Sequence, residues 1–436
     1  MALVNAAGAL PGPSVQLRIE QIAAGGAGVG RAPDGRVVFV HRTAPGDLVE
    51  VEVVEERKRW ARGRLLRVLQ PGAHRRPPPC PFYERCGGCT LEHLVYQAQL
   101  AAKRRMAADA LERIGGLVLP QSIPMTGSPH EFNYRNRVSF RLRRLGRTVV
   151  AGFHQLERPA HVLDVDQRCL LPERPVADAW GELRVSWGPG AQLLPAGASL
   201  RLTLRSSLAG QVALLVEGGQ GRGQPEELLR RVPAIAALWR SEGRGAPPVL
   251  AVGVEELDET WGDEQVALNG DVFLQVNRTA AALLEAQVLA LARTEAGMRV
   301  VDAYCGVGLH ARRLARAGAV VTGLEVDGPA VRQAAAAAPP GATFLEGRVE
   351  DLLPRALPAQ LVILNPPRTG VHGAALEALL QQPPDRIIYI SCDPATLARD
   401  LSRLASGFAV QSLHCFDLFP QTSHVETVAE LACSTT

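Results

Sequence analysis

The sequence is almost without lysine and has no long apolar run. Lys58 and Lys103 are its only lysines, so nearly all of its 47 basic residues are arginine. No apolar run approaches the roughly 20 residues that a membrane-spanning helix needs, so no membrane contact is expected. Residues 1–14 lack the basic stretch and apolar core of a secretory signal. A cytoplasmic location, where thiols stay reduced, is therefore expected.

Acidic residues are scarce in the first third of the chain. Residues 1–150 hold 23 basic and 12 acidic residues, a net charge of +11, whereas the remainder carries −8. A basic front part predicts a polyanionic partner, and arginine suits two-pronged contacts with phosphate. At 436 residues, 47% of them hydrophobic, the chain is expected to form two or three domains with sizeable cores.

The first seventy residues have the pattern of a small β-barrel. Short strand-like segments alternate with Gly and Pro turns from Val15 to Val68, which is typical of the OB type of nucleic-acid-binding barrel. Residues 57–67 place six basic side chains around Trp60, which suits phosphates and one stacked base. The alternative is a solvated basic strand edge that opposes aggregation. The barrel resembles a TRAM domain, an RNA-binding module, in the segments 28–30, 39–40 and 45–47.

Three cysteines cluster within ten residues. Cys80, Cys86 and Cys89 form a C-x5-C-x2-C run on a Gly-rich loop, and Cys169 is the candidate for a fourth ligand. Such a set of thiols suits either a tetrahedral zinc ion or an iron–sulfur cluster, and the spacing leaves both open. A disulfide is not expected in a reducing compartment.

The middle of the chain is predicted to be rich in strands. Residues 131–144 alternate with strand period, and their Arg-rich, aromatic-containing face suits an RNA backbone with splayed bases. A merely soluble sheet face is the alternative. Residues 97–114 have helical spacing, and residues 225–232 predict a short helix that one proline opens and the next one stops.

The C-terminal part contains a βαβ pattern with a glycine-rich turn. A helix over residues 279–294 precedes a strand over 298–304, a turn with Gly306 and Gly308, a helix over 309–317 and a second strand that ends near Glu325. Glycines let a ligand approach the backbone, and an acid at this strand end accepts bonds from ribose hydroxyls. By itself this pattern also fits an NAD-dependent oxidoreductase.

The next motif favours a methyltransferase over that alternative. A buried strand ends at Asn365, and the two prolines after it fix the backbone so that Asn365 is aimed into the cleft. Asn-Pro-Pro at this position resembles the motif of class I methyltransferases that use S-adenosylmethionine. Arg368 stands where amino-methylating DNA enzymes usually have an aromatic residue, which argues against amino methylation.

A cysteine follows the strand predicted over residues 387–390. Asp393 and Pro394 are typical of a helix start, so Cys392 is expected at a strand's carboxyl end and just before a helix N-terminus. Ligands bind at that edge of an α/β sheet, and the helix terminus favours the thiolate, which predicts a nucleophile. The alternative is a buried structural cysteine.

Taken together, the motifs resemble the RNA uracil-5 methyltransferase family over nearly the whole chain. They lie at residues 273–277, 302–308, 365–368, 391–400 and 419–426. The TRAM-like front and the cysteine spacing resemble the iron–sulfur-containing branch that acts on 23S rRNA. The sequence differs from the family pattern at two positions near the expected cofactor. Many members have Asp where Asn365 stands, and many have a small polar residue where Leu309 stands.

The resemblance implies a role for each motif. It implies S-adenosylmethionine contacts at Gln275, Tyr304, Glu325 and Asn365, beside the turn glycines Gly306 and Gly308. It implies Cys392 as nucleophile and Glu426 as base, and a [4Fe–4S] cluster on the four cysteines Cys80, Cys86, Cys89 and Cys169.

Carbon 5 of uracil is a poor nucleophile, and this explains the pairing of a thiol with a base. Addition of a thiolate at carbon 6 makes carbon 5 reactive, and a base must later remove the carbon 5 proton so that the cysteine can leave. Glu426 can serve if burial raises its pKa, and His424 is the alternative base. The uridine must also leave its stack to reach such a pocket.

We therefore predict an enzyme of three parts that acts as a monomer. Residues 1–14 are expected to be flexible, 15–72 to form the TRAM barrel, and 73–95 with 125–265 a β-rich domain around the cluster. Residues 96–124 and 266–436 are expected to form a Rossmann-like α/β methyltransferase domain. The predicted substrate is RNA, 23S rRNA rather than tRNA. The rivals are a non-catalytic RNA-binding protein, which the Cys392 and Glu426 pair disfavours, and an NAD-dependent oxidoreductase.

Overall fold

A computed structural model describes residues 14–119, 122–146, 148–243, 245–268, 272 and 274–434. The predicted flexible segment 1–14 lies outside these residues except for Ser14, and so does Phe273 of the 273–277 motif. The chain forms two compact units: residues 1–79, 89–106 and 421–423, and residues 80–88, 107–420 and 424–436. The domain limits expected from the sequence stay a prediction. Within the described ranges, no helix combines the length and the apolar character that a membrane crossing requires.

The first unit contains the expected barrel. Its apolar side chains alternate along each strand and meet inside, where Leu17, Val40 and Val51 are almost fully buried. Gly63 faces this interior, and a Cβ there would lie 2.1 Å from the Val51 side chain. The strands β1 (Ser14–Ile22), β2 (Gly28–Arg31), β3 (Val37–Val40), β4 (Leu48–Glu56) and β5 (Trp60–Gln70) close in the order β1-β2-β3-β5-β4.

The second unit contains a seven-stranded sheet with one face covered by two helices, α2 (Arg174–Ser186) and α3 (Pro225–Arg231). Under α2, the rings of Trp180 and Phe140 stack with centroids 3.9 Å apart. In spatial order the strands are β13 (Val249–Gly253), β12 (Ile235–Ser241), β11 (Val212–Glu217), β10 (Ser199–Ser206), β7 (Arg137–Leu145), β8 (Thr148–His154) and β9 (Val162–Asp164). A short turn of helix, η1 (Pro189–Ala191), and a separate hairpin, β14 (Leu257–Trp261) with β15 (Glu264–Leu268), complete this region.

An eight-stranded sheet forms the rest of the second unit. Its first five strands are parallel, and β22 runs antiparallel to both of its neighbours. In spatial order they are β18 (Ala342–Glu346), β17 (Val320–Glu325), β16 (Arg299–Ala303), β19 (Leu361–Leu364), β20 (Arg386–Ser391), β22 (Glu426–Cys433), β21 (Phe408–Phe416) and β6 (Met125–Thr126).

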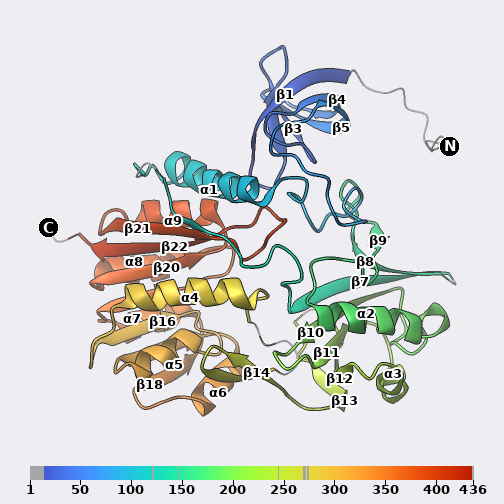
Figure 1. Ribbon diagram of the computed structural model, residues 1–436. Coiled ribbons are helices and arrows are strands. Elements are labelled where there is room, and N and C mark those ends of the chain that lie inside the picture. The colour runs from blue at the N-terminus through green and yellow to red at the C-terminus, as the bar shows by residue number, and fades with distance from the viewer. Residues whose placement is uncertain are drawn as a thin grey trace. The chain divides into compact units, whose positions relative to one another are not determined.

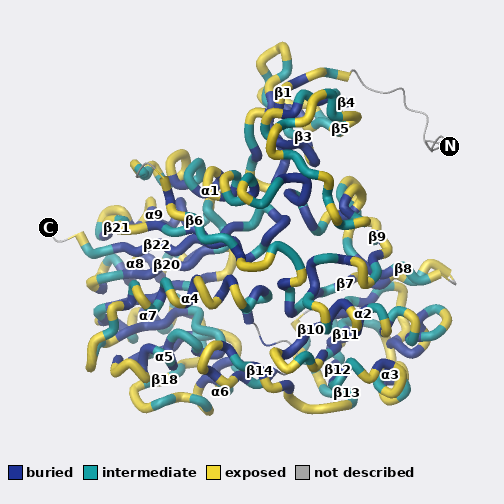
Figure 2. Tube along the Cα trace, viewed as in Figure 1, coloured by how far each residue is buried: buried dark blue, intermediate teal, exposed yellow. Residues whose placement is uncertain are grey.

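Helices cover both faces of this sheet (Figure 1). One face packs against α4 (Arg278–Ala292), α5 (Leu309–Arg316) and α6 (Gly328–Ala336). The other packs against α7 (Val349–Ala356), α8 (Gly373–Gln381), α9 (Pro394–Leu404) and the last turns of α1 (Tyr96–Arg113). β19 and most of β20 are buried (Figure 2) and continuously apolar, as expected of strands that are covered on both faces.

The strand order marks where a ligand binds. From β16 the chain passes to β17 and β18 on one side, and later to β19 and β20 on the other. In such sheets the crevice beyond the carboxyl ends of the strands, at the point where the order reverses, is the usual ligand site. The segments that follow β16, β17, β19 and β20 carry the motifs singled out above.

Candidate active site

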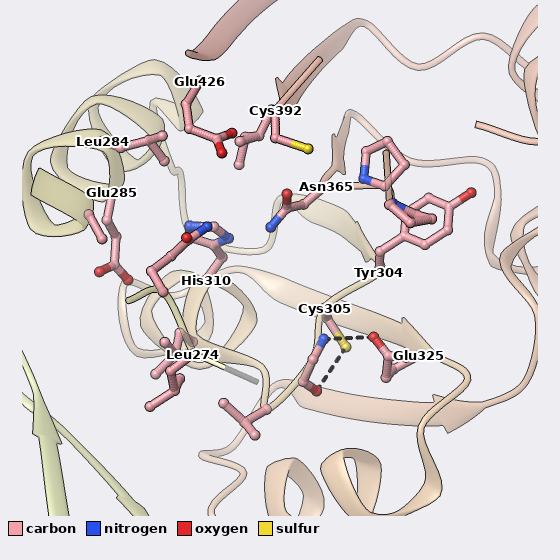
Figure 3. Close-up of a pocket in the computed structure, with 18 of the residues that line it drawn as sticks. Leu274, Leu284, Glu285, Tyr304, Cys305, His310, Glu325, Asn365, Cys392 and Glu426 are labelled. Carbon is pink, nitrogen blue, oxygen red and sulfur yellow. Dashed lines mark hydrogen bonds between the residues drawn. The ribbon is translucent and has the colours of Figure 1, made fainter. Parts of the chain in front are cut away.

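A pocket of about 620 Å³ opens at this carboxyl edge, within the second unit. Its lining includes seven of the predicted site residues: Gln275, Tyr304, Gly306, Glu325, Asn365, Cys392 and Glu426. Figure 3 shows Cys392 and Glu426 at one end of the pocket, Glu325 toward the other, and Asn365 between them. The structure therefore gathers residues that lie up to 151 positions apart in the sequence.

Gly308, the remaining residue predicted to contact the cofactor, is not part of the pocket lining and lies at the start of α5. It caps α5 with a φ of 75°, and its N–H donates to the carbonyl of Cys305 at 2.9 Å. A Cβ on Gly308 would lie 2.5 Å from the ring of Phe344. Both the positive φ and this close approach require glycine at this position.

The glycine turn and Glu325 form the wall at the ends of β16 and β17. The carboxylate of Glu325 accepts the Gly306 N–H at 3.0 Å and those of Val326 and Asp327 at 2.7 and 2.9 Å. Tyr304 has a φ of 63°, a strained conformation that is concentrated at functional sites. A Cβ on Gly306 would meet nothing within 4 Å, so the space beside this turn is open to a ligand.

The local structure around Cys392 is the predicted one, with the cysteine between β20 and α9. The Asp393 side chain caps the helix by accepting the Thr396 N–H at 2.9 Å. The helix terminus is expected to favour the thiolate, whereas burial raises the pKa of Cys392. The charge of Glu426 raises this pKa further, and the guanidinium of Arg368 lowers it.

Glu426 is buried at the first position of β22, with 4% of its surface exposed. Burial raises its pKa to about 7, against a smaller opposing effect of Arg368. The condition set for a carboxylate base is therefore met. His424 and Phe419 line the same pocket, and their rings meet edge to face with centroids 5.8 Å apart.

The sequence analysis did not identify one part of the pocket lining, which lies where the β14–β15 hairpin and α4 pack against α5. Trp261 donates its indole N–H to Glu285 at 3.1 Å, and Arg313 pairs with the same carboxylate at 2.6 Å. His310 lines the pocket as well, and burial lowers its pKa to about 4, so it is neutral at pH 7. These residues carry no common sequence pattern, because only the packing of the hairpin and of α4 against α5 brings them together.

The cysteines of the predicted metal site are divided between the units. Cys89 belongs to the first unit, whereas Cys80, Cys86 and Cys169 belong to the second. Burial raises the pKa of Cys169 to about 12, and the nearby thiols of Cys80 and Cys86 contribute to this rise. The described residues include no set of three or more Cys, His, Asp or Glu side chains placed to hold a metal ion. The cluster on these four cysteines therefore stays a prediction.

Known proteins are similar to this chain over nearly its whole length. The profile of the TRAM domain matches residues 9–66, and that of the tRNA (Uracil-5-)-methyltransferases matches residues 347–432. An uncharacterized RNA methyltransferase of Gloeobacter violaceus is 35% identical over 97% of both chains. Another, of Thermosynechococcus vestitus, is 34% identical over 97% of this chain and 99% of its own.

Among solved structures, the fold is similar to the Pyrococcus abyssi tRNA (uracil-54, C5)-methyltransferase in complex with S-adenosyl-L-homocysteine. The TM-score is 0.75 at 24% identity, over 96% of this chain and all of that one. The predicted fold class, a Rossmann-like methyltransferase domain with an N-terminal barrel, is confirmed. The chain belongs to the family of RNA methyltransferases.

Proposed function

We propose that this protein transfers the methyl group of S-adenosylmethionine to carbon 5 of a uridine in RNA. One observation carries the proposal: a single pocket holds a thiol, a buried carboxylate and a glycine turn beside a strand-end acid. The first two groups are those that addition and proton removal require. The last two are those that bind a nucleoside cofactor.

The cofactor would lie along the ends of β16 and β17. The open space at Gly306 lets a ligand reach the backbone, and Glu325 is held at the strand end to receive ribose hydroxyls. Gln275, Tyr304 and Asn365 complete the lining on that side. S-adenosylmethionine bound there would supply a sulfonium methyl group to the end of the pocket that holds Cys392.

The chain's own residues would act in order on a flipped uridine. The Cys392 thiolate adds to carbon 6, which gives carbon 5 the electron pair that forms the new carbon–carbon bond. Glu426 then takes the proton from carbon 5, and the bond to the Cys392 sulfur breaks. Arg368 lowers the pKa of both groups, and so favours the charged forms that these steps use.

The outer face of the seven-stranded sheet would guide the RNA backbone. Arg141 and Arg143 are exposed on β7, and the strand pairing sets Arg201 of β10 directly beside Arg141. Alternate residues of a strand are roughly 6.8 Å apart, which is comparable with the spacing of phosphates along an extended RNA strand. β7 begins next to the pocket, because the Asn136 N–H donates to Val276 and its side chain to Gln275. We propose 23S rRNA as the substrate and keep tRNA as the alternative.

We also propose that Cys80, Cys86, Cys89 and Cys169 hold a [4Fe–4S] cluster. The C-x5-C-x2-C spacing supports this, together with the electrostatic proximity of Cys169 to Cys80 and Cys86. Protein purified without oxygen should be brown and contain about four iron atoms per chain. Cys169→Ser should lose that iron, whereas Cys433→Ser should keep it. Stoichiometric zinc without iron would refute the proposal.

The reaction is tested by two variants with opposite outcomes. Cys392→Ala should bind S-adenosylmethionine and RNA but form no product, because addition to carbon 6 cannot begin. Glu426→Gln should add to the base and transfer the methyl group, but fail to remove the proton. It should therefore remain bonded to its methylated RNA and give a slow band in a denaturing gel, which Cys392→Ala should not. Normal turnover by Glu426→Gln would exclude Glu426 as the base, and His424 would be tested next.

A further inference from the structure

A tight turn follows Asn365 and carries Arg368 at its tip. The N–H of Gly370 donates to the Pro367 carbonyl at 2.8 Å and closes the turn. Arg368 is exposed toward solvent, yet it lines the pocket and acts electrostatically on both Cys392 and Glu426. The long side chain of Arg368 can hold this place only if the backbone of the turn is fixed.

The helix that begins after Cys392 fixes that backbone. The hydroxyl of Thr396 donates to the carbonyl of Arg368 at 3.1 Å, and the guanidinium of Arg399 donates to the carbonyl of Thr369 at 2.8 Å. The contact is also tight, since a Cβ on Gly370 would lie 2.3 to 2.4 Å from atoms of Thr396, Arg399 and Asp400. The turn therefore rests directly on α9.

Asp400 joins these contacts into one network. Its fully buried carboxylate accepts the N–H of Val371 at 2.9 Å and the hydroxyl of Tyr389 at 2.8 Å on one oxygen. The other oxygen accepts the Nε–H of Arg399 at 2.9 Å. Tyr389 lies on β20, three residues before Cys392. The carboxylate thus connects the strand that carries the thiol, the helix that follows it and the turn that carries Arg368.

We propose that Asp400 is a positioning residue, which fastens the 367–370 turn to α9 so that Arg368 stays in the lining of the pocket that holds Cys392 and Glu426. The inference rests on the proposed function, in which Arg368 favours the charged forms of Cys392 and Glu426. A carboxylate that only stabilised the fold would leave the chemistry of Cys392 unchanged when replaced by an amide. An amide has one acceptor oxygen, so Asp400→Asn must leave one of the two sets of donors without its partner.

The test measures the Cys392 thiol directly, without RNA or methyl transfer. The full-length protein is alkylated with iodoacetamide over a series of pH values, and mass spectrometry follows the peptides that contain Cys392 and Cys305. In Asp400→Asn the midpoint for Cys392 should move to higher pH, most of the way to that of Arg368→Ala. The double variant should move no further. Cys305, in the same pocket, should stay poorly reactive in every variant, because burial strongly raises the pKa of its thiol. In the methylation assay, kcat should fall on the order of tenfold while KM for S-adenosylmethionine stays within about twofold.

Three further variants separate positioning from folding. Arg403→Gln, on the exposed side of α9, should match the wild type in every measurement. Thr396→Val and Tyr389→Phe each remove one bond of the network and should shift the Cys392 midpoint in the same direction, by less. These two variants replace Asp400→Asn in the test if Asp400→Asn does not fold. The proposal would be overturned if Asp400→Asn had the wild-type midpoint for Cys392. If Asp400→Asn does not fold, wild-type midpoints in both Thr396→Val and Tyr389→Phe would overturn it. Because this readout needs no substrate, failure of the proposed reaction would be seen separately, as an inactive enzyme with the expected thiol profile.

Discussion

At the scale of single residues, the pocket places Cys392 and Glu426 where their reactive forms are disfavoured. Burial raises the pKa of the thiol and of the carboxyl, and the Glu426 charge opposes that of a Cys392 thiolate. Arg368 is the group that opposes both effects. In the proposed reaction, Glu426 must be a carboxylate to accept the proton from carbon 5. A base with a pKa near 7 is well matched to accept a proton at neutral pH and to release it afterwards.

These shifts predict how the activity depends on pH. Glu426 loses its proton as pH rises through about 7, and the Cys392 thiolate also grows with pH, so the single-turnover rate should rise from pH 6 to pH 8.5. Arg368→Ala removes the charge that lowers both pKa values, and should move this rise to higher pH. Single-turnover assays with saturating RNA measure both profiles. A rate that is flat from pH 6 to 8.5 in the wild type would contradict the assignment of these two groups.

At the scale of elements, the basic strand β5 is less available to RNA than its sequence suggests. Cross-strand pairing with β4 sets Arg62 near Glu55, Arg64 against Glu52 and Arg67 against Glu50. The exposed ion pairs are individually weak, but they place acidic charge where a phosphate would approach. Arg141 and Arg143 of β7, by contrast, have Gly152 and Val150 as their partners on β8. We therefore expect β7 to contribute more to RNA binding per arginine than β5.

This difference is measurable as a salt dependence. Arg141→Ala together with Arg143→Ala should weaken RNA binding and reduce the slope of log K against log salt by about 1.4, or about 0.7 for each lost phosphate contact. Replacing Arg57, Arg59, Arg62 and Arg64 should also weaken binding, with a smaller change in slope for each residue. Arg174→Ala, on α2 over the opposite face of the sheet, is the matched control and should change neither quantity. An unchanged slope in the β7 variant would place the RNA on another surface.

Several helices and a helix cap could be predicted from the sequence. The predicted helices over 97–114, 279–294 and 309–317 are α1, α4 and α5, and Asp393 caps α9 as expected. These features depend on local spacing and capping. The ion pairs of β5 and the Asp400 network depend instead on register and on contacts across the fold, such as that of Tyr389 with Asp400. The balance that sets the Cys392 pKa likewise depends on burial, which no local pattern reveals.

At the scale of the whole molecule, the chain combines two features that favour a large structured RNA. Its relatives match it over nearly their whole length, so the TRAM barrel and the methyltransferase domain occur together in one protein. The basic charge is concentrated in residues 1–150, outside the strands and helices that form the pocket. Under the proposed function, the basic part of the chain would bind the RNA and the pocket would carry out the reaction, which suits a target uridine chosen by its surroundings.

This arrangement predicts which cellular RNA loses its modification. A strain that lacks the protein should lose 5-methyluridine at a specific position of 23S rRNA, because the TRAM domain and the cysteine run resemble the ribosomal branch of the family. Mass spectrometry of nuclease fragments from purified rRNA and tRNA measures the loss at each position. The wild-type gene should restore the methyl group and Cys392→Ala should not, which ties the loss to the chemistry of the pocket. Loss from tRNA with unchanged rRNA would assign the protein to the alternative substrate, and no loss from either would contradict the proposed function.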